Sequence, residues 1–307
     1  MTTNEPNWDH YRSFLSVLTE GSLSGAARAL GLTQPTVGRH IDALEHALGL
    51  ALFTRSQTGF IPTEAAYELE PYAQTLAATS SALLRAASSM GRDGEHGIHG
   101  TVRITASEVV SVEVLPPLLA KLARSHPRIH VEVAVSNKLE NLLRRDADIA
   151  VRMTKPEHEA LIARRIGNIE LGFFAHRSYL KRRGTPRKWD ELANHTLIGV
   201  DSETAYTRAM RARFNAPPHE AHQLRCDNDV VQLAAIRAGV GIGICQVALA
   251  HAHGSLVRVL PDQLSIQLDT WLAMHENLRN NPACSAVFSA LAVGLSAYVD
   301  SQGALTL

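Results

Sequence analysis

Residues 21–45 read GSLSGAARALGLTQPTVGRHIDALE, and this stretch decides the fold of the first part of the chain. Residues 24–30 are rich in alanine, which favours a short helix with small side chains. A tight turn is predicted at Gly31. Thr33 is a good N-cap for a further helix, and Pro35 falls in its first turn, where a missing N–H does no harm. The stretch therefore predicts two helices joined by a short turn.

Apolar residues at helical spacing extend this pattern on both sides. A preceding helix is predicted by Tyr11, Phe14, Leu15 and Leu18. The helix that begins after Thr33 has a buried stripe formed by Val37, Ile41, Leu44 and Leu48. Its opposite face is polar and carries Thr36, Arg39 and His40. These features are typical of a helix-turn-helix, whose second helix enters the major groove of DNA.

The polar face has side chains that suit DNA. Gln34 can read an adenine edge, and Arg39 can bind a guanine edge or a phosphate. The alternative is an ordinary three-helix packing unit, because helix-turn-helix geometry also occurs in proteins that do not bind DNA.

The sequence itself resembles the LysR family of transcriptional regulators over residues 8–66. The matching segments are FLSV at 14–17, GSLSGAARAL at 21–30, QPTV at 34–37, IDALE at 41–45, LG at 48–49, LFTR at 52–55, Gly59 and PTEA at 62–65. Gly38 stands where serine is frequent in the family, and Ala66 where glycine is frequent. The resemblance implies a winged helix-turn-helix, with a wing over about residues 53–61 and Arg55 near the minor-groove backbone. The predicted DNA-binding residues are Thr33, Gln34, Pro35, Thr36, Arg39, His40 and Arg55.

The charge balance does not by itself indicate a nucleic-acid partner. Lysine plus arginine and aspartate plus glutamate both number 30, so the formal net charge is zero, whereas nucleic-acid-binding domains usually carry a basic face. Residues 1–62 contain fewer basic than acidic residues: the four arginines Arg12, Arg28, Arg39 and Arg55, and the five acids Glu5, Asp9, Glu20, Asp42 and Glu45. DNA binding must therefore depend on where a few arginines point.

A long helix is predicted over residues 63–92. Its seam alternates spacings of four and three, through Ala65, Leu69, Tyr72, Leu76, Thr79, Leu83, Ala86 and Met90. One explanation is a lone amphipathic helix that packs on its own domain. The resemblance implies the other, a linker helix that pairs two subunits, so that two recognition helices read a palindrome. The glycines of residues 90–97 indicate a hinge after this helix.

From residue 101 onward, β-rich segments alternate with helical ones. Strands are predicted over 102–106, 129–135, 148–152, 171–175, 197–200, 223–226, 241–245 and 268–274, with helices between them, for instance over 112–123 and 230–238. The alternation favours an α/β fold with mostly parallel sheets, in which the strands near 170 and 268 cross between two lobes. A looser LysR resemblance over 146–152 and 238–244 implies two α/β lobes with a cleft between them, as in the periplasmic binding proteins. Gln246 departs from this pattern, because the family often has proline there.

The predicted domains are a winged helix-turn-helix at 1–62, a linker helix at 63–92 and an effector-binding domain at 93–307. Within the last, lobe I covers about 93–168 and 268–307, and lobe II about 169–267.

Ligands of open α/β sheets bind at the carboxyl ends of strands. The residues that follow the predicted strands are Ser107, Ser136, Asn137, Arg152, Met153, Asp201, Ser202, Asp227 and Asn228. A helix cap is the competing explanation for each serine, asparagine and aspartate. Arg152 is less easily explained as a cap and can clamp a carboxylate. We therefore expect a small anionic effector that contacts Arg152 and Ser107, although Asp201 and Asp227 argue against a strongly anionic one.

Two other sensing chemistries stay open. Metal sensing would use His219, His222, His251 and His253 with Cys226, but these spacings lack the third and fourth ligands of a zinc site. A redox switch would use Cys226 and Cys245, and it needs a thiol of low pKa. Small buried thiols are the commoner case.

Enzyme activity, a cofactor and a membrane location are not expected. The chain lacks a P-loop, a dinucleotide glycine fingerprint and a nucleophile elbow. Three scattered cysteines fit a reducing cytoplasm, and no secretory signal is evident in residues 1–30. The richest apolar run, at 240–249, is too short to span a bilayer. The expected partners are double-stranded DNA with a palindromic promoter site, a small-molecule effector, RNA polymerase and further copies of the chain, as a dimer and a dimer of dimers.

Overall fold

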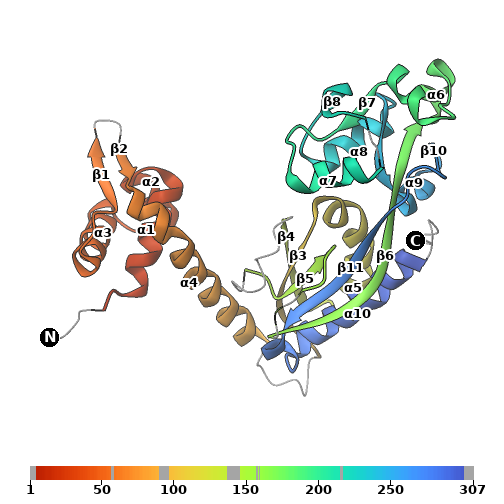
Figure 1. Ribbon diagram of the computed structural model, residues 1–307. Helices are drawn as coiled ribbons and strands as arrows, with labels where there is room; N and C mark the ends of the chain where they lie inside the picture. Colours follow the sequence, from red (N-terminus) through yellow and green to blue (C-terminus); the bar gives the residue numbers. More distant parts are fainter. Residues whose placement is uncertain are drawn as a thin grey trace. The chain divides into compact units, whose positions relative to one another are not determined.

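The computed structural model describes residues 5–56, 59–89, 97–136, 146–156, 158, 160–214 and 217–300. The predicted hinge, apart from Gly97, and the candidate effector residue Asn137 lie outside these ranges. The chain divides into two compact units, the first ending at Leu84 and the second beginning at Arg85. Figure 1 labels the helices and strands of both units.

The first unit contains the predicted winged helix-turn-helix. Its elements are α1 (Trp8–Glu20), α2 (Leu23–Leu30), α3 (Gln34–Leu48), β1 (Phe53–Ser56) and β2 (Gly59–Pro62). The side chains of Phe14, Val37 and Ile41 are almost completely buried where the three helices meet. Strands β1 and β2 pair antiparallel and form the wing, as the resemblance implied.

Two glycines make the helix-turn-helix geometry possible. Gly31 ends α2 with a φ of 67°, a left-handed conformation that glycine adopts without a steric penalty. At Gly25, an added Cβ would lie 2.9 Å from the Cβ of Glu20, so α2 approaches the end of α1 more closely than alanine would permit. Both positions explain why this turn sequence specifies the fold.

Helix α4 (Glu64–Ser88) continues without interruption through Pro71. Several of its large apolar side chains are exposed, among them Tyr72 at 72% and Leu83 at 67%. Both residues belong to the predicted seam, together with Leu76, which is also exposed. A single copy of the chain therefore leaves much of this seam uncovered.

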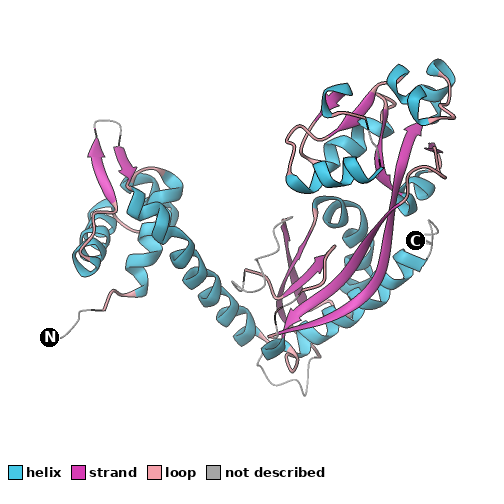
Figure 2. Ribbon diagram, in the orientation of Figure 1, coloured by secondary structure: helices cyan, strands magenta, loops and turns pink. Residues whose placement is uncertain are grey.

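The second unit is built on one continuous mixed sheet. Its strands are β3 (Gly100–Ala106), β4 (Ile129–Val135), β5 (Ile149–Arg152), β6 (Leu161–His176), β7 (Leu197–Gly199), β8 (His222–Arg225), β9 (Ile242–Gln246), β10 (Leu256–Val259) and β11 (Ile266–His275). Its helices are α5 (Leu115–Ser125), α6 (Arg177–Arg183), α7 (Ala205–Phe214), α8 (Asp229–Arg237), α9 (Val247–His253) and α10 (Pro282–Asp300), and a π-helical turn, η1 (Val110–Val114), precedes α5. Figure 2 shows helices packed on both parts of this sheet.

The long strands β6 and β11 connect two lobes. They pair antiparallel from Ile266 opposite Leu171 to His275 opposite Leu161. In lobe I, β3 pairs parallel with β4 and β5, and in lobe II, β7 pairs parallel with β8 and β9. The predicted two-lobed α/β fold is thus confirmed, although β6 is longer than predicted and β10 was not predicted. The expectation of mostly parallel sheets is wrong, because β6 pairs antiparallel with β9, β10 and β11, and β11 pairs antiparallel with β5.

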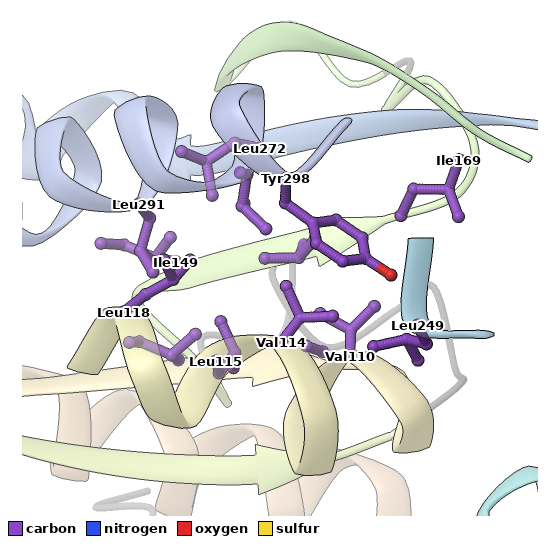
Figure 3. Close-up of a cluster of buried hydrophobic side chains, with 14 of the residues drawn as sticks. Val110, Val114, Leu115, Leu118, Ile149, Ile169, Leu249, Leu272, Leu291 and Tyr298 are labelled. Carbon is purple, nitrogen blue, oxygen red and sulfur yellow. The ribbon is translucent and has the colours of Figure 1, made fainter. Parts of the chain in front are cut away.

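Helix α10 corrects one expectation from the sequence. An 18-residue window within its 19 residues has a mean hydropathy of 1.6, so a run long and apolar enough to cross a membrane does exist. One face of the helix, including Leu291, Leu295 and Tyr298, is buried in the core of lobe I. Figure 3 shows Leu291 and Tyr298 packed with Leu272 of β11 and Val114 of η1. The apolar composition of α10 is therefore that of a helix that fills a protein core.

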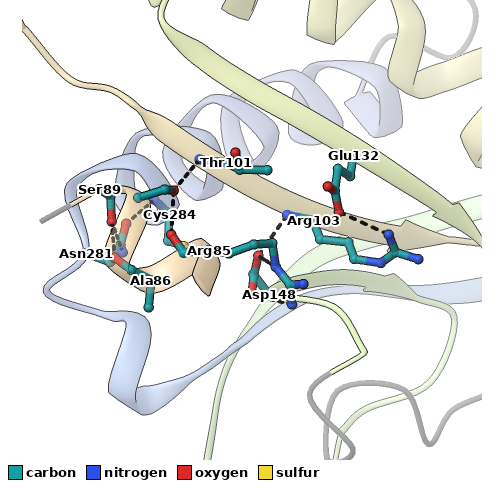
Figure 4. Close-up of polar contacts among 10 residues, drawn as sticks. Arg85, Ala86, Ser89, Thr101, Arg103, Glu132, Asp148, Asn281 and Cys284 are labelled. Atoms are coloured by element: carbon teal, nitrogen blue, oxygen red, sulfur yellow. Dashed lines mark hydrogen bonds and ion pairs between the residues drawn. The ribbon is translucent and has the colours of Figure 1, made fainter. Parts of the chain in front are cut away.

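A buried ion pair holds the end of α4 against this sheet. The Nε atom of Arg85 donates to Oδ2 of Asp148 at 2.8 Å, and the two side chains are only 9% and 4% exposed. Asp148 Oδ2 also accepts the backbone N–H of Arg103 at 2.8 Å. Figure 4 shows these contacts next to the exposed pair of the Arg103 side chain with Glu132. Asp148 therefore joins α4, β3 and the start of β5.

Replacement of Asp148 tests this contact. We expect Asp148→Ala to lower the free energy of unfolding by about 3–5 kcal/mol, because it leaves a buried guanidinium and a backbone N–H without their acceptor. The matched control, Glu132→Ala, removes the exposed carboxylate next to it and should cost less than about 1 kcal/mol. Urea denaturation measures both, and equal effects of the two substitutions would contradict the assigned role of Asp148.

Candidate DNA-binding and effector sites

The start of α3 presents most of the predicted DNA-binding residues. Thr33, Gln34, Pro35 and Arg39 are exposed, and Thr36 is half-buried. Thr33 occupies the N-cap position, but its hydroxyl forms a 2.8 Å hydrogen bond with the hydroxyl of Thr36 and does not cap the helix. The Thr33 carbonyl instead accepts the backbone N–H groups of Thr36 and Val37, at 3.0 and 3.1 Å, and Pro35 has no N–H to offer.

His40 faces α1. Its Nδ1 lies 2.8 Å from the hydroxyl of Ser13, and its ring packs against that of His10 at 5.2 Å. Burial, with His10 nearby, lowers the pKa of His40 and so favours its neutral form. His40 thus fixes α3 against α1, and its predicted contact with DNA stays a prediction. The backbone of Arg55 lies in β1, and its side chain is outside the described part of the structure.

Glu45 has a structural role in positioning the wing, which a count of charges does not reveal. Its Oε1 accepts the backbone N–H groups of Leu52 and Phe53, at 2.7 and 3.0 Å. These bonds attach the first residue of the wing to α3. One of the five acids of this region is therefore used to position the wing.

In lobe I, the candidate effector residues lie at the carboxyl ends of neighbouring parallel strands, which we call the effector edge. Ser107, Ser136 and Arg152 follow or end β3, β4 and β5, which are parallel to one another. The backbone N–H of Ser136 donates to the carbonyl of Ala106 at 2.9 Å, so the segments after β3 and β4 lie side by side. Met153 follows Arg152, and its sulfur accepts a bond from Thr270 at 3.4 Å.

Arg152 is a buried cation with neutral partners. It is 6% exposed, and it donates to the carbonyl of Val151 at 3.0 Å and to the hydroxyl of Thr105 at 3.1 Å. Its Nε has no acceptor among the described residues. Burial lowers the pKa of this guanidinium, but an arginine stays protonated at neutral pH. The site therefore favours an anion that would compensate the charge.

In lobe II, the candidate residues are engaged with one another. Asp227 accepts the backbone N–H groups of Asp201 and Ser202 at 2.9 and 2.7 Å, and the Ser202 hydroxyl at 2.6 Å. Asn228 caps α8 by accepting the N–H of Val231 at 2.9 Å. The helix-cap explanation is thus correct for Asn228, and Asp227 holds the loop after β7 against the loop after β8.

Two glutamates that the sequence analysis missed connect the lobes. Glu108, just after β3, accepts the N–H of Asp229 at the start of α8 at 2.8 Å. Glu113, in η1, forms a two-pronged pair with Arg237 at the end of α8, at 2.7 and 2.7 Å. The Arg237 hydrogen bonds lower the pKa of Glu113, whereas burial, with Glu108 nearby, raises the pKa of Asp229. The candidate effector residues of lobe I and those of lobe II therefore face each other, because α8 is bonded to lobe I at both of its ends.

The metal and redox alternatives receive no geometric support from the described residues. Within those ranges, no group of three or more histidine, cysteine or acidic side chains is placed to hold a metal ion. Cys245 and Cys284 are buried. Burial raises the pKa of each to about 12, which is the opposite of a reactive thiol.

A winged helix-turn-helix joined to a two-lobed α/β unit defines a class of regulator with one domain for DNA and one for a small molecule. Family models bear this out. The model described as "Bacterial regulatory helix-turn-helix protein, lysR family" matches residues 8–67, and "LysR substrate binding domain" matches residues 95–294. The chain belongs to the LysR family of transcriptional regulators.

Individual relatives agree with this assignment. An "HTH-type transcriptional regulator" of Xanthomonas campestris pv. campestris (strain 8004) is 30% identical over 187 residues, which is 61% of this chain and 53% of that protein. The regulator CrgA of Neisseria meningitidis serogroup B is 28% identical over 269 residues, 84% of this chain and 87% of that one. The crystal structure of full-length CbnR with its target DNA has a TM-score of 0.64 at 19% identity, covering 97% of this chain and 100% of that one. The chain thus spans about half the length of the first relative and most of the second.

Cysteine labelling tests the accessibility of the thiols. At about pH 8, we expect iodoacetamide to modify the half-buried Cys226 in the native protein and to spare Cys245 and Cys284, because buried thiols do not form the nucleophilic thiolate. In urea, all three should react, which is the control. Mass spectrometry of the digested protein gives the result, and rapid native labelling of Cys245 would revive the redox alternative.

Proposed function

We propose that the protein is a sequence-specific DNA-binding regulator of transcription, controlled by a small anionic effector that binds between its two α/β lobes. It acts without a cofactor or an enzymatic step, in the cytoplasm, as a dimer or a dimer of dimers on a palindromic promoter site. RNA polymerase is the partner through which it alters transcription.

The DNA-binding part of the proposal is supported by the exposed start of α3. Gln34 and Arg39 are exposed on this helix and carry the groups that read base edges in a major groove. The related fold of CbnR is known in complex with that protein's target DNA. We therefore assign α3 as the recognition helix and β1–β2 as the wing.

Dimerisation is supported by the uncovered seam of α4. Tyr72, Leu76 and Leu83 are exposed, yet they belong to the four-and-three repeat of a helix that packs on another helix. A second copy of α4 would cover them. The pairing doubles the number of recognition helices, so that the few arginine contacts of each copy act together on one DNA site.

Arg152 carries the proposal of an anionic effector. It combines deep burial, a full positive charge and, within the described ranges, only neutral partners, at the edge of lobe I that faces lobe II. A carboxylate or phosphate at this place would accept the free Nε–H. The carboxylate of Asp227, which argued against an anion in the sequence, accepts hydrogen bonds from Asp201 and Ser202 of the neighbouring loop.

The mechanism is a shift between two arrangements of the lobes. An effector alters regulation only if it binds one arrangement better than the other. The bonds of Glu108 and Glu113 to α8 belong to the arrangement described here. An effector that favours another arrangement must compete with these bonds, and the resulting change is proposed to alter DNA bending and the contact with polymerase.

A gel-shift assay with the DNA upstream of the protein's own gene tests the DNA-binding proposal. We expect specific retardation that weakens steeply with salt, and a loss of affinity of about tenfold or more in Arg39→Ala. Arg12→Ala, an exposed arginine on α1, is the matched control and should change affinity much less. No specific shift at low salt, with or without small carboxylates, would sink the proposal.

Arg152→Met tests the effector site even before the effector is known. Because the substitution replaces an uncompensated buried cation by an apolar side chain, we expect a higher melting temperature of the ligand-free protein. In a screen of small carboxylates by calorimetry, binders of the wild type should lose about tenfold to a hundredfold in affinity in the variant. Unchanged affinity would show that Arg152 does not bind the effector.

A further inference from the structure

Lobe II contains a pocket of its own, apart from the edge that faces lobe I. The pocket has a volume of about 230 Å³, and all of its lining residues lie between Leu171 and Ile266, within lobe II. Strands β6 and β9 provide its floor, and α7 provides one wall. None of the predicted effector residues lines it. It is therefore a separate site and not an extension of the proposed effector site.

The floor of the pocket exposes a residue that a sheet normally buries. Strand β9 lies inside the sheet, paired with β6 on one side and β7 on the other. Its other residues are buried, but Ile244 in its middle is 39% exposed. Ile244 lines the pocket with Leu171 and Phe173 of β6, so the space above this part of the sheet is not filled by the described side chains.

The apolar face of helix α7, which forms a wall of the same pocket, is also incompletely buried. Thr207, Met210 and Phe214 lie on one face at helical spacing and all line the pocket. Each is only half-buried, and of the side chains that are described in this helix, none is fully buried. A surface helix normally buries its apolar stripe against the core. Here the stripe faces the pocket instead.

The chemistry of the walls selects for an uncharged occupant. Glu203 and Arg211 line the pocket and are paired with each other. The side-chain amide of Gln232 donates to the carbonyl of Cys226 at 2.6 Å. The remaining lining side chains are mostly large and apolar, including Ile242 and Leu264. A charged ligand would lose its hydration here without gaining a free ionic partner.

We infer that this pocket binds a small neutral apolar molecule of one or two rings. An apolar cavity of about 150 Å³ stays dry and takes up benzene, so the larger volume here accommodates a bigger molecule. Native cores contain few voids larger than a water molecule, and a ligand would restore the contacts that Ile244, Met210 and Phe214 lack. This second site goes beyond the proposed function, because it differs from the Arg152 site in place and in chemistry.

A short segment that contains Ser202 and Thr204 connects the pocket to the part of lobe II that faces lobe I. The Oγ1 atom of Thr204 accepts the N–H of Thr207 at 3.1 Å and so caps α7. Ser202, two residues earlier, is held by Asp227 at the edge of lobe II. A ligand that orders α7 therefore acts on the loop that faces lobe I, which makes the site suitable for a co-effector.

Fluorobenzene is the probe for this pocket, measured by ¹⁹F NMR on the full-length protein. We expect saturable binding to one site per chain. Met210→Trp fills the pocket from α7 and should weaken binding by about tenfold or more. Val293→Trp is the matched control, because it places the same side chain on the exposed face of α10, where Val293 is 71% exposed. It should bind fluorobenzene as the wild type does.

Two further variants keep the result unambiguous. If Met210→Trp fails to fold by circular dichroism, Ile244→Ala replaces it, and the enlarged pocket should bind 1-fluoronaphthalene more tightly than the wild type does. Arg152→Met should leave fluorobenzene binding unchanged, whatever happens to the proposed anionic effector. The inference is overturned if the wild type shows no saturable binding up to the solubility limit, if both pocket variants bind the probes as the wild type does, or if Arg152→Met abolishes binding.

Discussion

The carboxylate of Asp148 is the group on which the arrangement of the second unit depends. It binds the guanidinium of Arg85, where this unit begins, and the backbone N–H of Arg103 in β3. A buried ion pair is weak evidence for stability, because the desolvation of both charges offsets most of their attraction. Its role here is geometric, because it attaches Arg85, in the last turn of α4, to the residue that precedes β5.

The same short strand connects this ion pair with the proposed effector site. Asp148 immediately precedes β5, and Arg152 is the last residue of β5, so the two groups are separated by about 13 Å of extended chain. All four residues of the strand are buried between β3 and β11, which leaves it little freedom to adjust locally. A ligand that shifts the backbone of Arg152 must therefore shift the whole of β5. For this reason β5 is a more direct connection between the effector edge and Arg85 of α4 than the loops of lobe II are.

The sequence predicted those parts of the molecule that local patterns determine. Gly31 and the stripe through Ile41 lie within a few residues of one another, and the helices formed as expected, although the hydroxyl of Thr33 bonds to Thr36 and does not cap α3. The wing followed from the family resemblance. The alternation of strands and helices likewise predicted the two lobes. The contacts between the lobes could not be predicted, because Glu108 and Glu113 pair with residues more than a hundred positions away. No local pattern distinguishes such a glutamate from one on a solvated surface. Arg152, in contrast, could be singled out from the sequence, because an arginine directly at the end of an apolar strand is unusual.

The near balance of charges in the DNA-binding unit is less of an objection than the count suggests. Glu45 is bound by two backbone N–H groups of the wing, and Asp9 lies in the first turn of α1, where the helix dipole favours a negative charge. Asp42 opposes DNA most directly, because it is exposed on α3 only three residues after Arg39. At physiological salt, charges beyond about 8 Å are largely screened, so the distances of individual groups from a phosphate decide more than their sum does. An exposed arginine on α3 is therefore compatible with specific but weak binding by one copy, and the proposed pairing through the uncovered seam of α4 would join two.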